Sequence, residues 1–264
     1  MEFRTVVDIE KPPFVIQPRE RMLFVGSCFA DRIGKRFLQE NFQAVVNPDG
    51  VMYNPASILH TVERTDYAPR VAFFTLGTNH VYILRESGEI VDNCQKKPQK
   101  LFREQVLTVE ECVDFLERAV EQLLNRREDV RIVVTVSPIR YAKYGFHGSQ
   151  LSKATLLMAA DCLCRKYPDV VTYFPAYEIV CDELRDYRFY QPDMLHPSDQ
   201  AVEYIWERFA QAFFSETTHQ YLREWKPIKE ALAHRPFNPE SPEYQSFIQR
   251  TRQQAAALEA KYPV

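Results

Sequence analysis

Glycine is scarce in this chain, with only seven among 264 residues. Because glycine adopts positive φ more readily than any other residue, few turns of the fold can depend on that conformation. Long apolar runs are also missing, since none approaches the roughly 20 residues that a helix needs to cross a bilayer. We therefore expect no membrane span.

The chain also lacks an excess of positive charge. Lysine and arginine total 33 against 36 aspartate and glutamate residues, which gives a net charge of −3. A nucleic-acid partner is not expected, because such proteins carry a basic patch or stripe. The contents of 45% hydrophobic and 26% charged residues are typical of a soluble globular protein. The length suits one large domain or two small ones.

Cysteines are few and scattered. Only Cys162 and Cys164 lie close together, and no second pair completes the spacing of a zinc site. We expect reduced thiols, no structural metal and no cofactor. The first 20 residues carry charges and prolines in place of the apolar core of a signal peptide. Together with the unpaired thiols, this predicts a cytoplasmic location.

The stretch from Arg21 to Gly34 predicts a strand, a tight turn and a helix. An apolar run ends at Gly26-Ser27, and apolar residues then recur at helical spacing. A serine in such a turn lies at a helix N-terminus, where unpaired backbone N–H groups stabilise negative charge. Ser27 is therefore either a nucleophile or a helix cap, since serine is also a favoured N-cap residue.

Five apolar runs alternate with helical patterns along the chain. The strands are expected at 22–26, 43–47, 71–77, 131–138 and 170–174. The main helices are expected at 28–40, from Asn54-Pro55 onward, from the capping box at Thr108 onward, at 149–167 and at 198–214. This alternation predicts an α/β fold with a parallel sheet covered on both faces. Ligands bind such sheets outside the carboxyl ends of the strands.

The sequence predicts a main domain over residues 1–219 and a helical extension over 220–264. Residues 81–107 are interpreted as an insertion, with a small hairpin followed by a polar, lysine-bearing loop. Four prolines interrupt the extension, so one surface helix is expected at 241–262. This extension can pack on the domain or serve a partner, including a second copy in a homo-oligomer.

Asp193 and His196 form the clearest acid–base pair in the sequence. A carboxylate three residues before an imidazole can lie beside it on a tight turn. The carboxylate then holds one ring nitrogen while the other faces a serine, as in a catalytic triad. This motif follows the last strand, so we expect it at the same sheet edge as Ser27. The alternative is that Pro192–Pro197 is only a polar loop.

The segment Gly26-Ser27-Cys28-Phe29-Ala30 spells the signature after which the GSCFA family is named. The sequence resembles that family over roughly residues 20–215, and the family resembles the SGNH, or GDSL-like, hydrolases. Further matching segments are 47–50, 53–55, 76–78, 137–140 and 193–197. The resemblance implies a three-layer α/β/α sandwich with about five parallel strands in a flavodoxin-like order. It also implies Ser27 as the nucleophile, His196 as the base and Asp193 as the residue that orients it.

The resemblance also points to an oxyanion hole. In SGNH enzymes it is formed by the serine N–H, a glycine after the second strand and an asparagine after the third. Gly50 is the glycine suited to this role, and Asn79 occupies the asparagine position, although His80 follows it where aspartate is usual. Asn79 is otherwise an ordinary turn residue. Asn54 is the reserve candidate, although capping of the next helix already explains it.

Other residues near the predicted sheet edge are weaker candidates for catalysis or substrate binding. Cys28 is a rival nucleophile, since a helix start is a setting that activates thiols, but cysteines there are commonly buried and inert. Arg140, Lys143 and His147 lie in a loop that either binds an anionic or sugar substrate or is simply solvated. His80 is an alternative base that has no carboxylate nearby in sequence.

The sequence therefore predicts a serine ester hydrolase, an O-deacylase acting on an acylated carbohydrate or small molecule. The same residues can pass the acyl group to another alcohol, so an acyltransferase is the nearest alternative. A non-catalytic binding module is the second alternative, since a fold does not fix a function.

Overall fold

The computed structural model describes residues 1–264 except 2, 93 and 95–96. Its main sheet is parallel, with the strand order β2-β1-β3-β7-β8. These strands are β1 (Arg21–Gly26), β2 (Gln43–Val46), β3 (Val71–Leu76), β7 (Arg131–Val136) and β8 (Val171–Tyr173). Each begins within one residue of its predicted start. The predicted fold class is confirmed, including the flavodoxin-like order.

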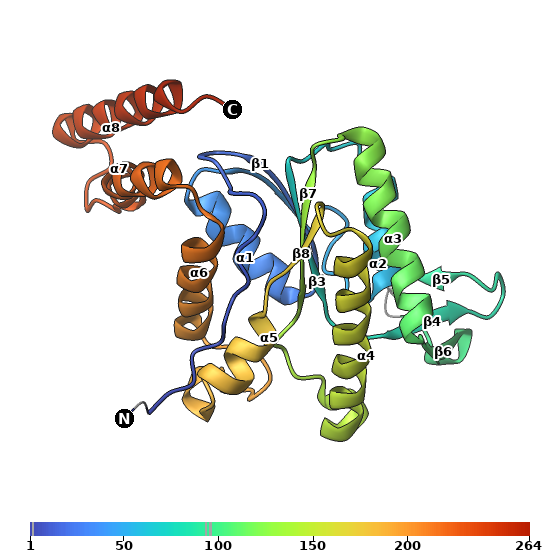
Figure 1. Ribbon diagram of the computed structural model, residues 1–264. Coiled ribbons are helices and arrows are strands. Elements are labelled where there is room, and N and C mark those ends of the chain that lie inside the picture. The colour runs from blue at the N-terminus through green and yellow to red at the C-terminus, as the bar shows by residue number, and fades with distance from the viewer. Residues whose placement is uncertain (2, 93, 95–96) are drawn as a thin grey trace.

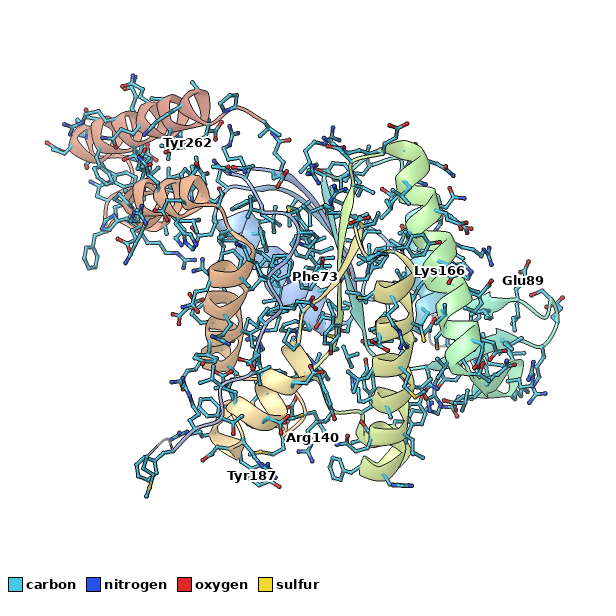
Figure 2. All side chains as sticks on the ribbon, viewed as in Figure 1. Phe73, Glu89, Arg140, Lys166, Tyr187 and Tyr262 are labelled. Carbon is cyan, nitrogen blue, oxygen red and sulfur yellow. The ribbon has the colours of Figure 1, made fainter. Side chains whose placement is uncertain are left out.

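Helices cover both faces of this sheet (Figure 1). On one face lie α1 (Cys28–Gln39) and α6 (Asp199–Phe213), and on the other α2 (Pro55–Arg64), α3 (Val109–Arg126) and α4 (Gly145–Lys166). Alternate residues of each strand face opposite layers. Phe73, central in Figure 2, packs in the core beneath α1 and α6, whereas Phe74 packs in the core beneath α2, α3 and α4. Each such buried side chain contributes about 1.5–3 kcal/mol.

Short helical turns lie in several of the connections between these elements. After β8 come α5 (Ala176–Glu178) and a π-helical turn at Ile179–Glu183. Single 3₁₀ turns lie at Gln99–Leu101, Ala142–Tyr144 and Tyr187–Phe189. Among the described residues, no helix combines the length and apolarity needed to cross a membrane.

The insertion forms a separate antiparallel sheet with the order β5-β4-β6. Its strands are β4 (His80–Leu84), β5 (Ile90–Val91) and β6 (Phe102–Val106). The expected hairpin corresponds to β4 and β5, but β6 was not predicted. Its Arg103-Glu104-Gln105 segment is polar on both faces, so no alternation marks it as a strand. The lysine-bearing loop was predicted on a segment that includes residues 93, 95 and 96, which lie outside the described residues.

The C-terminal extension contains two helices, α7 (Glu216–Ala233) and α8 (Pro242–Lys261). α8 was predicted, but α7 was not, because Pro227 was interpreted as a break and instead lies inside the helix. The predicted domain boundary at 219/220 falls within α7 and stays a prediction.

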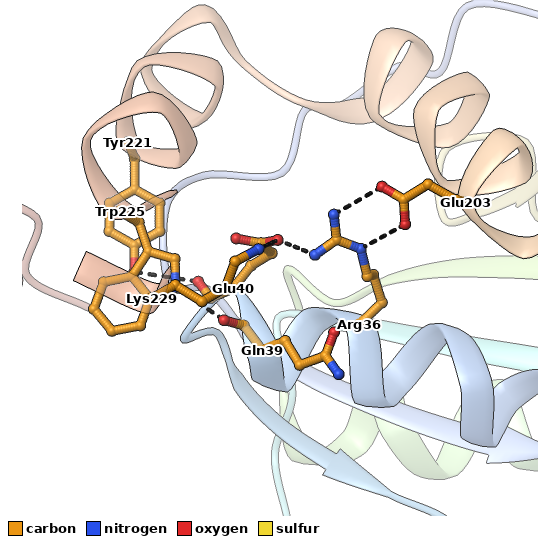
Figure 3. Close-up of polar contacts among 7 residues, drawn as sticks. All are labelled: Arg36, Gln39, Glu40, Glu203, Tyr221, Trp225 and Lys229. Carbon is orange, nitrogen blue, oxygen red and sulfur yellow. Dashed lines mark hydrogen bonds and ion pairs between the residues drawn. The ribbon is translucent and has the colours of Figure 1, made fainter. Parts of the chain in front are cut away.

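Helix α7 packs against the end of α1 (Figure 3). The indole of Trp225 donates to the Gln39 carbonyl at 2.9 Å, and the hydroxyl of Tyr221 donates to the Glu40 carbonyl at 3.2 Å. Both bonds satisfy carbonyl groups at the end of α1 that have no helical partner. Lys229 of α7 forms an ion pair with the Glu40 carboxylate. Figure 2 shows the extension, marked by Tyr262, at the opposite end of the molecule from Arg140.

Candidate active site

The end of β1 approaches β3 so closely that only glycine fits. A Cβ atom on Gly26 would lie 2.2 Å from the Thr75 carbonyl oxygen, and the φ of Gly26 is +138°. Both observations exclude a larger residue at this position. The next residue, Ser27, is thereby held against β3.

Ser27 is the N-cap of α1, as one of the two sequence interpretations predicted. Its Oγ accepts the Phe29 N–H at 3.2 Å and lies 3.0 Å from Thr75 Oγ1. Its own N–H donates to Thr75 Oγ1 at 2.8 Å. The residue is fully buried, and no hydrogen bond joins it to His196 in the described part of the chain. The role of the Ser27 hydroxyl as nucleophile stays a prediction.

Asp193 and His196 do come together, on the tight turn that their spacing predicted. Asp193 Oδ2 lies 2.6 Å from His196 Nδ1, while Oδ1 accepts the backbone N–H groups of Leu195 and His196 at 2.9 and 3.0 Å. These hydrogen bonds, the backbone ones first, lower the pKa of Asp193 to about 2. The carboxylate is thus ionised at neutral pH and holds the imidazole in one orientation.

The turn that carries His196 is fixed between β7 and α1. The N–H of Arg140, in the loop after β7, donates to the Leu195 carbonyl at 3.0 Å, and its Nη1 donates to the Met194 carbonyl at 3.0 Å. From α1, Arg32 Nη1 donates to the Pro197 carbonyl at 2.8 Å. The guanidinium of Arg140 also packs over the Phe146 ring at 4.2 Å, and a role of Arg140 in substrate binding stays a prediction.

The predicted oxyanion donors are engaged elsewhere. The Gly50 N–H donates to the Asn47 carbonyl at 2.8 Å within its own turn. Asn79 Nδ2 donates to the Leu107 carbonyl at 2.7 Å, which ties β4 to the end of the insertion. The roles of Gly50 and Asn79 as oxyanion donors stay predictions. Asn54 caps α2 through Oδ1, and its Nδ2 donates to no described residue.

The alternative base and the basic loop residues anchor the insertion. His80 stacks on Tyr144 with ring centroids 3.6 Å apart, and it lies 3.3 Å from Glu104. Burial lowers the pKa of His80, although the charge of Glu104 opposes this. Lys143 pairs with the same carboxylate at 3.2 Å, whereas His147 is exposed. Neither His80 nor Lys143 shares a hydrogen bond with the Asp193–His196 pair within the described residues.

Lys153 is a residue at this edge that the sequence analysis missed. It is 2% exposed, and its Nζ donates to the carbonyl groups of Gly77 and Ser137 at 2.8 and 2.7 Å. Burial lowers the pKa of its ammonium to about 7. The sequence feature that could have indicated this buried lysine is its position as the single charged residue in the segment from Gly148 to Ala160.

Two clefts lie on the surface of the domain. The larger, of about 850 Å³, lies between α2 and the insertion and contains a second histidine–aspartate pair, His60 and Asp92, at 2.8 Å. Its described lining includes no serine, threonine or cysteine, so it offers no hydroxyl or thiol nucleophile beside this pair. The smaller cleft, of about 370 Å³, adjoins Arg140 and is lined by Tyr187 and Tyr190. Arg140 and Tyr187 are labelled side by side at this edge in Figure 2.

Two family models match this chain. The model of the GSCFA family matches residues 21–69 and 67–209, which together form most of the sequence. The chain belongs to the GSCFA family. A second model, described as the C-terminal domain of GSCFA domain proteins, matches residues 225–264 and hence the second half of α7 and all of α8.

Solved structures share the fold of this GSCFA protein at low sequence identity. A protein assigned as a GDSL-like lipase from Parabacteroides merdae has a TM-score of 0.51 and 12% identity, over 76% of this chain and 98% of that one. A mutant acetyl-xylooligosaccharide esterase from Geobacillus has a TM-score of 0.50 and 11% identity, over 77% and 98%. No curated protein matches the GSCFA chain in sequence. The fold is therefore that of SGNH-like esterases.

Proposed function

We propose that this chain is an ester hydrolase that removes an O-acyl group from a carbohydrate or small molecule. The observation that carries the proposal is the Asp193–His196 pair, joined at 2.6 Å beside the carboxyl ends of a parallel sheet. Ligands bind at this edge in such folds. The esterase fold of the chain supports the same chemistry.

In this mechanism His196 Nε2 takes the proton of a nucleophile at the start of α1. Asp193 holds Nδ1 and stabilises the imidazolium that forms. The sequence offers two candidate nucleophiles there, Ser27 and Cys28. The resulting acyl-enzyme is then hydrolysed by water, with the same histidine acting as base.

The cleft beside Arg140 supports a carbohydrate as the alcohol component. Tyr187 and Tyr190 offer aromatic faces, while Gln150 and Asp186 add hydrogen-bonding groups. A few polar groups among aromatic side chains are typical of small-molecule sites. An acetylated xylo-oligosaccharide, the substrate class named for one structural neighbour, is therefore a suitable first test compound.

A non-catalytic binding module is the second candidate. The observation that favours it is the engagement of the predicted oxyanion donors at Ser27, Gly50 and Asn79 in internal hydrogen bonds. The acyltransferase alternative uses the same residues as the hydrolase and differs only in the acceptor, which is an alcohol in place of water.

The test is hydrolysis of p-nitrophenyl acetate and of an acetylated xylo-oligosaccharide by the purified full chain. We expect His196→Ala to reduce kcat/KM roughly a thousand-fold or more, because catalytic bases contribute on this scale. His219→Ala, on α7, is the matched control and should leave the rate unchanged. Equal rates for the wild type and His196→Ala would contradict the mechanism. Product analysis with an added alcohol separates the transferase from the hydrolase.

A further inference from the structure

We propose that the nucleophile of this site is the thiol of Cys28 and not the hydroxyl of Ser27. The inference rests on the proposed acyl chemistry and identifies the residue that carries the acyl group. Four observations lead to it: access, the helix face, unpaired donors and the engagement of Ser27.

Access separates the two neighbouring residues. Ser27 is fully buried, and its Oγ accepts from Phe29 and contacts Thr75 Oγ1. Cys28, one residue later, is half-buried, and its Sγ lies 3.7 Å from the Tyr53 hydroxyl. Tyr53 is itself 38% exposed, so the thiol lies beside a surface that a substrate can reach.

The helix face places Cys28 on the same side as the His196 turn. Residues four apart on an α-helix are neighbours on one face. Arg32 is four residues after Cys28, and its Nη1 holds the carbonyl of Pro197, the residue directly after His196. Ser27 precedes the helix and faces Thr75 of β3 instead. The base is thus docked on the face of α1 that presents the sulfur.

A hydroxyl without a hydrogen-bond partner in the described part of the chain lies behind Tyr53, the residue that neighbours the thiol. The hydroxyl of Tyr141 is buried and has no partner among the described residues. Its ring packs edge-to-face against Tyr53 with centroids 5.8 Å apart. Burial raises the pKa of Tyr141 well above its ordinary value, and charge on Tyr53 or Cys28 raises it further. The hydroxyl therefore keeps its proton.

The backbone adds a second donor at the same place. The N–H of Cys28 lies in the first turn of α1 and donates to no described group. Helix N-termini stabilise negative charge for this reason. A buried donor without a partner is costly unless something else satisfies it. An oxyanion formed at the Cys28 acyl carbon would accept from this N–H and from the Tyr141 hydroxyl.

The proposed reaction uses only the thiol, His196, the ester and water. His196 Nε2 takes the thiol proton while sulfur bonds to the ester carbonyl carbon, whose oxygen becomes the oxyanion. Collapse of this intermediate breaks the carbon–oxygen bond, and the leaving alcohol takes the proton from His196. Water then attacks the thioester and gives its proton to His196, which returns it to sulfur as the carbon–sulfur bond breaks. The products are one alcohol and one carboxylic acid.

The experiment locates the acyl group in the wild-type full chain. The protein is mixed with p-nitrophenyl acetate, quenched in acid, digested and sequenced by tandem mass spectrometry. We expect acetyl on Cys28 and its release by neutral hydroxylamine, as for a thioester. Because this measurement uses no variant, a folding defect cannot obscure it. Acetyl on Ser27 would overturn the inference while the proposed function stands.

Variants give the second measurement. We expect Cys28→Ala to lose roughly a thousand-fold or more in kcat/KM. Cys162→Ala, the matched control on α4, should stay within a few-fold of the wild type. Full activity in Cys28→Ala would overturn the inference. A wild-type chain that neither hydrolyses any ester nor takes up an acyl group would instead overturn the proposed function, and the assignment of Cys28 with it.

Discussion

The ammonium of Lys153 joins the ends of two strands beneath the candidate site. It is buried, and it donates to a carbonyl group after β3 and to another after β7. Burying a charge is expensive, because water no longer solvates it. This explains why burial lowers the pKa of the group to about 7. Lys153 therefore makes the stability of the sheet edge depend on pH.

The variant Lys153→Met tests this dependence. The folded chain releases the proton near pH 7, whereas the unfolded chain holds it to about 10.5, so unfolding takes up a proton between these values. As the pH rises from about 7 to about 10.5, the free energy of unfolding of the wild type should increase relative to that of the variant, by up to about 1.4 kcal/mol per pH unit. Urea unfolding of both proteins at several pH values measures it, with Lys35→Met as an exposed control. A constant difference would contradict the lowered pKa.

Residue-level predictability depended on how far apart the partners lie in sequence. The Asp193–His196 contact was predictable because one tight turn contains both residues. The hydrogen bond from Arg140 to Met194 joins positions 54 residues apart, so no local pattern reveals it. For the same reason, the sequence could not indicate that Thr75 encloses Ser27. Lys153 appeared to be an ordinary helix lysine until its position beneath two strand ends was known.

At the scale of elements, the loop after β7 and the His196 turn act as one unit. Arg140 supplies both the backbone and the side-chain bonds between them. Its guanidinium packs between the rings of Phe146 and Tyr190, at 4.2 and 5.5 Å. A planar guanidinium suits this stacking better than the point charge of a lysine ammonium.

We therefore expect Arg140→Lys to lower kcat by about 10- to 100-fold, since displacing a catalytic group by about 1 Å can have this effect. The variant should keep its fold, because the substitution is at a partly exposed position. Steady-state kinetics on a short-chain ester, with circular dichroism, provide the measurement. Arg223→Lys on α7 is the matched control. An unchanged kcat would mean that Arg140 does not position His196.

The elements themselves were predicted in proportion to the strength of their patterns. The five main strands are short apolar runs, which burial on both faces requires, and all five were identified. β6 was missed because the exposed insertion needs no apolar face. α7 was missed because its proline is a strong local signal, while the helix packs against α1, far away in sequence.

At the scale of the whole molecule, the site and the C-terminal extension lie at opposite ends (Figures 1 and 2). α7 packs on the last turn of α1 through Tyr221 and Trp225. α8 is joined to the residues just before β1, where Arg19 donates to the Glu259 carbonyl at 3.0 Å. The extension thus stabilises the domain at the amino ends of the strands and covers no part of the candidate site.

This arrangement predicts that loosening the extension changes stability and not turnover. Trp225→Ala should lower the free energy of unfolding by about 3–5 kcal/mol, the range for truncating a buried aromatic residue. The kcat of the folded variant should stay within a few-fold of wild type. Leu232→Ala is the control, because this α7 side chain is 38% exposed. Urea unfolding and ester hydrolysis measure both quantities. Lost activity in a folded Trp225→Ala protein would contradict the prediction that the extension affects stability alone.

Helix α1 nevertheless spans the distance between these two ends. Its 12 residues make a rod of about 18 Å. The first turn of this rod bears the Cys28 sulfur, and Tyr221 and Trp225 of α7 donate hydrogen bonds to its last turn. A short helix tilts as a stiff body when one end is pushed. Because Arg32 of the same helix holds the Pro197 carbonyl, such a tilt would carry the His196 turn along with the sulfur, and loosening the extension should leave turnover intact.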